Sequence, residues 1–246
     1  MNASLLILAL ATFLLAGLVK GVIGMGLPTV AMGMLALALP PAEAAALLVI
    51  PSFVTNVWQL LAGPSFAVLA RRLWPMMAGI VVGTVAGAGI LAGDVAGVAG
   101  VGLGLALVVY ALVGLAGLGL SVSPRREVWL APLIGLSTGL VTGATGVFVL
   151  PAVPYLQAIG LEREDLIQAL GLSFTVSTVA LALGLLRVEA WQAGSLWLSL
   201  AALVPALGGM QAGQALRRRL PAVLFRRVFF FGLLLLGLYL SARGLA

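Results

Sequence analysis

The sequence contains no cysteine and no histidine, and few of its 246 residues are charged. Without cysteine there is no disulfide framework and no thiolate metal site, and without histidine the commonest metal ligand and proton shuttle is missing. Charged residues make up only 8% of the chain, whereas a soluble domain carries about 25%. We therefore expect no metal, no cofactor and no water-soluble domain.

Hydrophobic residues, in contrast, make up 63% of the chain. They form continuous runs of Leu, Ala, Val and Gly, and a helix that crosses the bilayer needs about 20 such residues. Because every segment inside hydrocarbon must satisfy its own backbone groups, these runs predict helices. A transmembrane β-barrel would instead show alternation with a period of two. The expected fold is an all-α integral membrane protein, a polytopic helical bundle in the cell (plasma or inner) membrane.

The net charge of +6 is carried by arginine in twelve of the thirteen basic positions. These arginines lie in short connections between apolar runs, as the positive residues of cytoplasmic loops do. The charge therefore indicates orientation in a membrane, and we expect no nucleic-acid partner. The first apolar run, 1–17, has no basic start and continues into further apolar sequence, so we interpret it as a retained helix rather than a cleaved signal.

Ten hydrophobic passes are expected, five on each side of a polar break at 121–127. They cover 4–19, 24–39, 43–62, 73–92, 97–120, 128–142, 146–159, 164–186, 192–213 and 222–242.

The two sets of five passes share motifs in the same order. Gly17-Leu18-Val19-Lys20-Gly21-Val22-Ile23-Gly24 lines up with Gly139-Leu140-Val141-Thr142-Gly143-Ala144-Thr145-Gly146, and Ser52-Phe53 answers Ser173-Phe174. Several matches at nearly constant offset predict an internal duplication, with a first repeat at 1–122 and a second at 128–246. An odd number of passes in each repeat makes the repeats inverted.

Loop charge gives the expected orientation. With five passes in each half, one face receives most of the arginines, and positive-inside bias makes that face cytoplasmic and places both termini outside the cytoplasm. The arginines on this face are Arg71, Arg72, Arg125, Arg126, Arg163, Arg217, Arg218, Arg219, Arg226 and Arg227. Equivalent loops also exchange charge, because Asp94 in the first half corresponds to the arginines at 217–219 in the second.

Each repeat begins with a helix pair that is broken by glycine, at 20–28 and at 142–146. The expected arms of 14–16 residues are short for a bilayer core of about 30 Å, so they are either short tilted spans or hairpins that turn back inside the membrane. Inverted hairpins of this kind meet near the midplane in transporters, where free helix N–H groups favour an anion. Lys20 adds a charge at the first break.

Structural alternatives stand beside the functional ones. A lysine near a helix end can extend its ammonium to the interface. Glycines in membrane helices commonly mark close helix packing, which is our interpretation of Gly83, Gly87, Gly209, Gly213 and the glycine run from 97 to 119. Polar stripes in the third pass of each half add Thr55, Gln59 and Thr178 as neighbours of the candidate site. The residues expected to bind substrate are Lys20, Gly21, Gly24, Ser52, Asn56, Thr142, Gly143, Thr145, Gly146, Ser173 and Ser177.

At these residues the sequence resembles the sulfite exporter TauE/SafE family of membrane transporters. The resemblance rests on the glycine-broken stretches at 17–28 and 139–151 and on the continuation at 168–178, and it extends over essentially the whole chain. Met25 and Val147-Phe148 depart from the family's Gly-Gly-Gly form of the break. The resemblance implies transport of sulfite, organosulfonates or related small anions.

The expected function is therefore transport of a small anion, most simply export of sulfite or an organosulfonate that is facilitated by the protein and driven by the membrane potential. The alternatives are an anion channel and an ion-coupled importer of another small carboxylate or sulfur-containing anion. An enzyme is not expected, since no intramembrane carboxylate pair, histidine or cysteine offers acid–base or metal chemistry. The expected partners are the anion and the lipid bilayer, and a homodimer is left open.

Overall fold

The computed structural model describes residues 3–93, 98–117, 119–188, 193–217, 219 and 221–245, and every regular element in these ranges is a helix. Ten helices follow one another, matching the ten expected passes in order. They are α1 Ala3–Ile23, α2 Leu27–Leu35, α3 Pro41–Leu61, α4 Phe66–Ala92, α5 Val98–Ala116, α6 Pro124–Thr145, α7 Ala152–Ala158, α8 Arg163–Arg187, α9 Ala193–Arg217 and α10 Ala222–Leu245.

Eight of these ten helices are long and apolar enough to cross a membrane, and the two exceptions are α2 and α7. Large apolar side chains cover the outside of the bundle, among them Trp129, Trp197 and Val204, which are each at least three-quarters exposed. Lipid tails solvate such a surface, and water does not. The predicted polytopic helical membrane protein is confirmed.

The two glycine breaks differ from the expected pairs of equal arms. α1 and α6 have 21 and 22 residues, whereas α2 and α7 have only 9 and 7. At 1.5 Å per residue the short arms extend about 14 and 10 Å, so each break joins a spanning helix to a short returning one. α1 continues through Gly21 and α6 through Gly143 because tight packing against a neighbouring helix supports the helix there.

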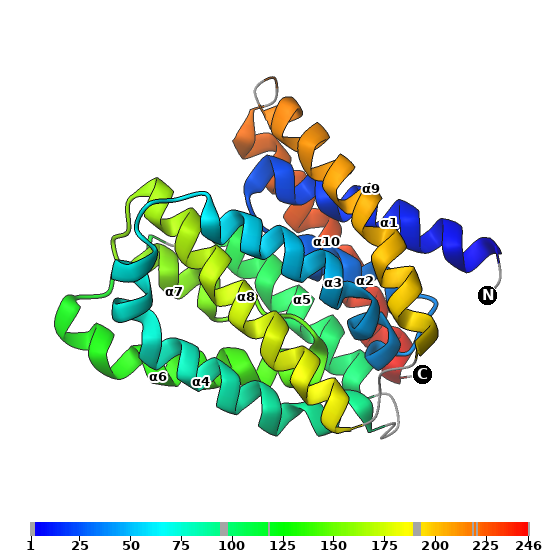
Figure 1. Ribbon diagram of the computed structural model, residues 1–246, viewed down its shortest axis with the longest axis horizontal. Helices are drawn as coiled ribbons and strands as arrows, with labels where there is room; N and C mark the ends of the chain where they lie inside the picture. Colours follow the sequence, from blue (N-terminus) through cyan, green and yellow to red (C-terminus); the bar gives the residue numbers. More distant parts are fainter. Residues whose placement is uncertain are drawn as a thin grey trace.

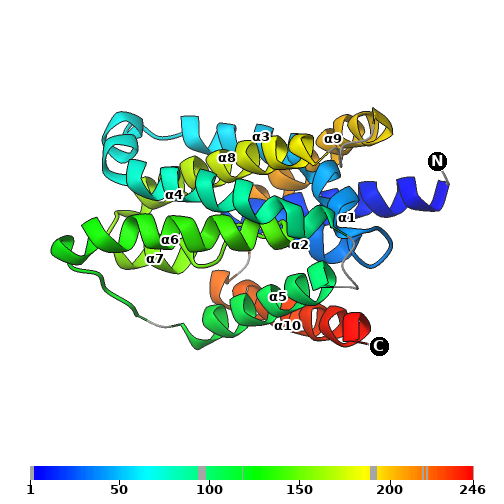
Figure 2. The same cartoon turned by 90° about the horizontal axis from the view of Figure 1, so that it is seen from below.

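Helices from the two sides of the polar break interleave (Figures 1 and 2). α1 packs against α9 and α4 against α6, while α5 pairs with α10 and α3 with α8. Exchanging the first five helices for the last five turns the first of these pairs into the second and leaves the other two unchanged. This symmetry agrees with a duplicated chain, and the inversion of the repeats stays a prediction.

Glycines line the two crossings in which helices approach most closely. In the α4–α6 crossing, a Cβ atom on Gly83 would overlap the carbonyl oxygen of Leu136, and one on Gly87 would lie 2.8 Å from that of Leu140. In the α1–α9 crossing, a Cβ on Gly209 or Gly213 would overlap a backbone carbonyl of α1. These four glycines therefore serve close packing, as predicted. The prediction for the run from 97 to 119 is only partly right, since Gly104 packs against α10 but an added Cβ on Gly100 or Gly119 meets nothing within 4 Å.

The chain ends and most of the arginines lie at opposite ends of the bundle. The N and C marks are at the same end in both views (Figures 1 and 2). At the other end, Arg72 at the start of α4 donates to Glu127 at the start of α6, over 2.6 and 2.7 Å, and to the Ile159 carbonyl after α7. Arg218 and Asp94, which entered the charge comparison, lie outside the described residues.

Candidate functional site

Lys20, in the last turn of α1, is the buried charge of the membrane interior. Its side chain is only 4% exposed. The Nζ atom donates to Thr55 Oγ1 over 3.2 Å and to Asn56 Oδ1, and Asn56 Nδ2 donates to Thr178 Oγ1 over 3.3 Å. A chain of hydrogen bonds therefore connects α1, α3 and α8, and the lysine points into the bundle rather than toward an interface.

The ammonium of Lys20 has no carboxylate partner among the described residues. The ion pair found in them is between Arg72 and Glu127 at the arginine-rich end. Both acceptors that Lys20 contacts are neutral, and a buried ion without a counterion costs several kcal/mol. A site of this kind has an unmet demand for negative charge.

Three serines on α3 and α8, the helices that carry the acceptors of this network, have hydroxyls with unused hydrogen-bonding capacity in the described part of the chain. Ser52 on α3 and Ser173 and Ser177 on α8 are fully buried, and none of the three has a hydrogen-bond partner in the part of the chain that the structure describes. The spacing of three and four residues places Ser52 beside Thr55 and Asn56, and Ser173 beside Ser177. Buried hydroxyls are normally paired, so these three are suited to receive a ligand.

The threonines of the second break do not join this network. Thr142 Oγ1 donates to the Thr138 carbonyl of its own helix over 2.7 Å, and Thr145 Oγ1 to that of Val141 over 2.6 Å. Thr145 also accepts a hydrogen bond of 3.2 Å from the Val147 amide. Both threonines are buried, and both stabilise the end of α6, where no cation corresponds to Lys20.

The four glycines of the candidate set fall into two pairs. Gly24 and Gly146 adopt left-handed backbone angles, with φ of 81° and 71°, which explains glycine at the point where each helix ends. Gly21 and Gly143 lie inside the helices, where an added Cβ would overlap the backbone of α9 and of α4, respectively. The second pair therefore has a packing role that the sequence pattern did not assign to it.

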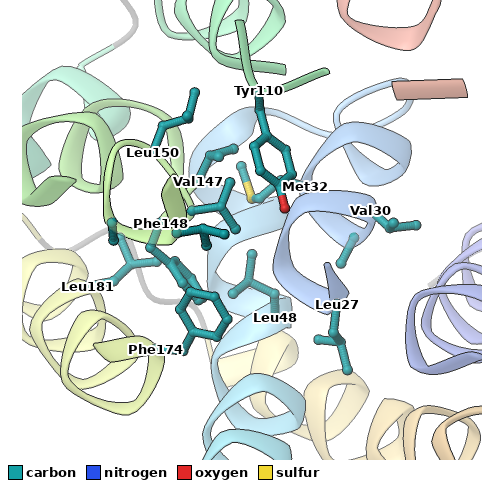
Figure 3. Packing of buried hydrophobic residues seen from close by; sticks show 14 of the residues in the cluster. Leu27, Val30, Met32, Leu48, Tyr110, Val147, Phe148, Leu150, Phe174 and Leu181 are labelled. Atoms are coloured by element: carbon teal, nitrogen blue, oxygen red, sulfur yellow. The ribbon is translucent and has the colours of Figure 1, made fainter. Parts of the chain in front are cut away.

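Apolar side chains fill the surroundings of the second break (Figure 3). Phe148 stacks at a tilt against Phe174, with ring centroids 5.6 Å apart. Gly146 lies against the Met32 side chain of α2, and Val147 is fully buried. Apart from Thr142 and Thr145, the polar side chains expected to bind substrate thus belong to α1, α3 and α8.

A cavity near the first break was not predicted from the sequence. A cavity of about 530 Å³ opens among the ends of α5, α7 and α9 and the starts of α8 and α10, and Arg163, Arg217 and Arg226 line it. These arginines entered the sequence argument only as markers of orientation. Their convergence depends on how five helices come together, which spacing along the chain does not encode.

A bundle of membrane-spanning helices that buries a lysine without a carboxylate partner among the described residues suits a membrane transporter that handles anions. The sulfite exporter TauE/SafE family matches residues 9–240, and the chain belongs to this family. It is therefore a multi-pass membrane transporter of sulfite or related anions. Neither the curated proteins nor the solved structures contain a match to the chain.

Proposed function

We propose that the protein exports sulfite or a small organosulfonate, and that Lys20 is the residue that binds the anion during transport. The observation that carries the proposal is the buried ammonium, whose acceptors Thr55 and Asn56 are both neutral. An oxyanion placed beside it would supply the missing negative charge. Charge-assisted hydrogen bonds of this kind are about twice as strong as neutral ones.

The neighbouring side chains suit an oxyanion with several acceptor oxygens. Ser52, Ser173 and Ser177 each have a hydroxyl without a partner in the described part of the chain, and each can donate to a sulfite or sulfonate oxygen. Asn56 already bridges Lys20 and Thr178, so it would hold the ammonium in position. Of the remaining candidates, Gly24, Gly146, Thr142 and Thr145 belong to the helix ends at the two breaks, and Gly21 and Gly143 pack against α9 and α4.

Export of an anion needs no coupling ion. The electrical work released is about 2.3 kcal/mol per charge for each 100 mV of a negative-inside potential. The described acidic residues, which are Glu43, Glu127, Glu162, Glu164 and Asp165, lie at or just before the first turns of α3, α6 and α8. None of them is placed to relay a proton beside Lys20, so we favour facilitated, potential-driven export.

The test replaces Lys20 with Met, which has a similar length and no charge. Purified Lys20→Met should lose the rise in melting temperature that sulfite gives the unmodified protein, because a ligand stabilises only the state that binds it. Flux of radiolabelled sulfite from liposomes should fall by about tenfold or more, the equivalent of 1.4 kcal/mol of binding. Arg71→Gln, which removes an exposed charge, is the matched control.

The outcomes separate the competing functions. Unchanged sulfite stabilisation and flux in Lys20→Met would show that the lysine serves only the structure. Flux that requires a H⁺ or Na⁺ gradient would replace export by ion-coupled uptake. Flux that does not saturate with sulfite would indicate a channel.

A further inference from the structure

The arginine-lined cavity has the charge of an anion site. Of the described residues that line it, Arg163, Arg217 and Arg226 are charged, and all three are basic. Arg226 Nη2 donates to the Gly114 carbonyl at the end of α5 over 3.2 Å, which holds this guanidinium at the wall. Three like charges around one cavity repel each other, and a bound anion relieves that repulsion.

The last turn of α1 reaches the cavity and also carries Lys20. Val22, Ile23 and Met25 of the first break line the cavity, and the Gly24 amide donates to the Lys20 carbonyl over 2.8 Å. Tyr110 also lines the cavity; it is 2% exposed, and its hydroxyl donates to Met25 Sδ over 3.2 Å. Lys20 is therefore two residues along the chain from Val22, which lines the cavity, while its ammonium contacts Thr55 and Asn56 of α3.

A second cavity at the opposite end of the bundle provides an internal comparison. Its volume is about 550 Å³, and the ends of α2, α4 and α10 line it together with the starts of α3 and α5. Under the predicted duplication these are the counterparts of most of the elements around the first cavity. Among its described lining residues Arg243 is the charged one, and Arg243 Nη1 donates to the Leu37 carbonyl over 2.7 Å. The two cavities are similar in size and differ in charge.

We propose that the arginine-lined cavity is a second anion site, a vestibule in which Arg163, Arg217 and Arg226 collect small oxyanions before they reach Lys20. This deepens the proposed export function, on which it rests, by naming the place where the anion is loaded. A cavity with one sign of charge and low-dielectric walls raises the local anion concentration and the rate of association by 10-fold to 10³-fold. The opposite cavity lacks this charge and suits release.

The absence of cysteine from the sequence allows a test that is independent of transport. Gly119 lines the arginine-lined cavity and Gly100 the opposite one, and an added Cβ meets nothing within 4 Å at either position. In detergent, Gly119→Cys should react at least about tenfold faster with an anionic than with a cationic methanethiosulfonate of similar size. Gly100→Cys should show a smaller preference. Sulfate or isethionate should slow the reaction at position 119.

Neutralising the arginines identifies the source of the effect. Arg217→Gln or Arg163→Gln in the Gly119→Cys protein should reduce both the preference for the anionic reagent and the protection by sulfate, whereas Arg71→Gln should leave both unchanged. Lys20→Met should retain both, so failure of the Lys20 site and failure of the vestibule are distinguishable. Equal rates for the two reagents, no reaction at position 119, or a preference without protection by sulfate would each overturn the proposal.

Discussion

Ser52, Ser173 and Ser177 keep three hydroxyl groups away from water with no partner in the described part of the chain. A buried polar group without a hydrogen bond costs about 1–3 kcal/mol. Such a cost is expected where the missing partner is a ligand, because the stability lost without the ligand is recovered when it binds. Removing one of these hydroxyls should therefore raise the stability of the ligand-free protein and weaken the binding of the anion.

Replacing Ser177 with Ala is the corresponding prediction. The ligand-free protein should melt at the same temperature or higher, since a costly buried hydroxyl of about 1 kcal/mol or more is removed. Sulfite should stabilise the variant less than it stabilises the unmodified protein. Both effects are measured in one thermal-unfolding series in detergent, with and without sulfite.

Thr84→Val is the control for the serine variant. Thr84 on α4 also carries a buried hydroxyl without a partner among the described residues, and it takes no part in the hydrogen-bond chain of Lys20. The substitution keeps the shape of the side chain, and it should leave stabilisation by sulfite intact. If Thr84→Val and Ser177→Ala lower the sulfite effect equally, the serine hydroxyl has no specific role in binding.

The crossing of α4 and α6 is the most extensive described contact between elements, and it predicts a sharp difference between two glycines of one helix. Gly83→Ala should lower the melting temperature strongly, since the new methyl group overlaps the Leu136 carbonyl and overpacking costs about 1–3 kcal/mol. Gly89→Ala should be neutral or stabilising by about 0.4–1 kcal/mol, because nothing lies within 4 Å of the added atom. Equal melting temperatures for the two variants would contradict the crossing geometry.

Hydrophobic runs predicted the helices well, and their ends less well. α4 begins at Phe66 rather than at the expected 73. The helix therefore includes Arg71 and Arg72, which the hydrophobic pattern had assigned to a loop. α1 continues through Gly21, where glycine suggested a break. A glycine that admits a neighbouring backbone and a glycine that ends a helix look the same in a sequence, since only the partner helix distinguishes them.

For the whole molecule, the position of the arginines predicts how it lies in the membrane. The arginine-rich end should be cytoplasmic, and both termini should be outside the cytoplasm. In intact cells, a membrane-impermeant maleimide should label Gly100→Cys at once and Gly119→Cys only after the membrane is permeabilised. The reverse result would place the arginine-lined cavity outside the cytoplasm and turn the proposed loading site into one for uptake.

The polar site could be predicted in part from the sequence. The charge on Lys20 and the stripe from Ser52 to Asn56 indicate an intramembrane site by themselves, because such residues are rare in hydrocarbon. Which side of the first break they face depends on how α1 lies against α3 and α8. The sequence gives no comparable indication of the vestibule. Its three arginines come from the start of α8, the end of α9 and the start of α10, and only the packing of these helices brings them together.

The two glycine crossings also set an order of events at the ribosome. α4 and α6 emerge close together, whereas α9, the partner of α1, begins only at Ala193. At about 5–20 residues per second, synthesis reaches α9 roughly 8–34 seconds after α1 is complete. Throughout this time the packing partner of Gly17 and Gly21, which is the backbone of α9, has not been synthesised. α1 is thus the first helix to be synthesised and among the last to complete its packing, because that packing requires the final quarter of the chain.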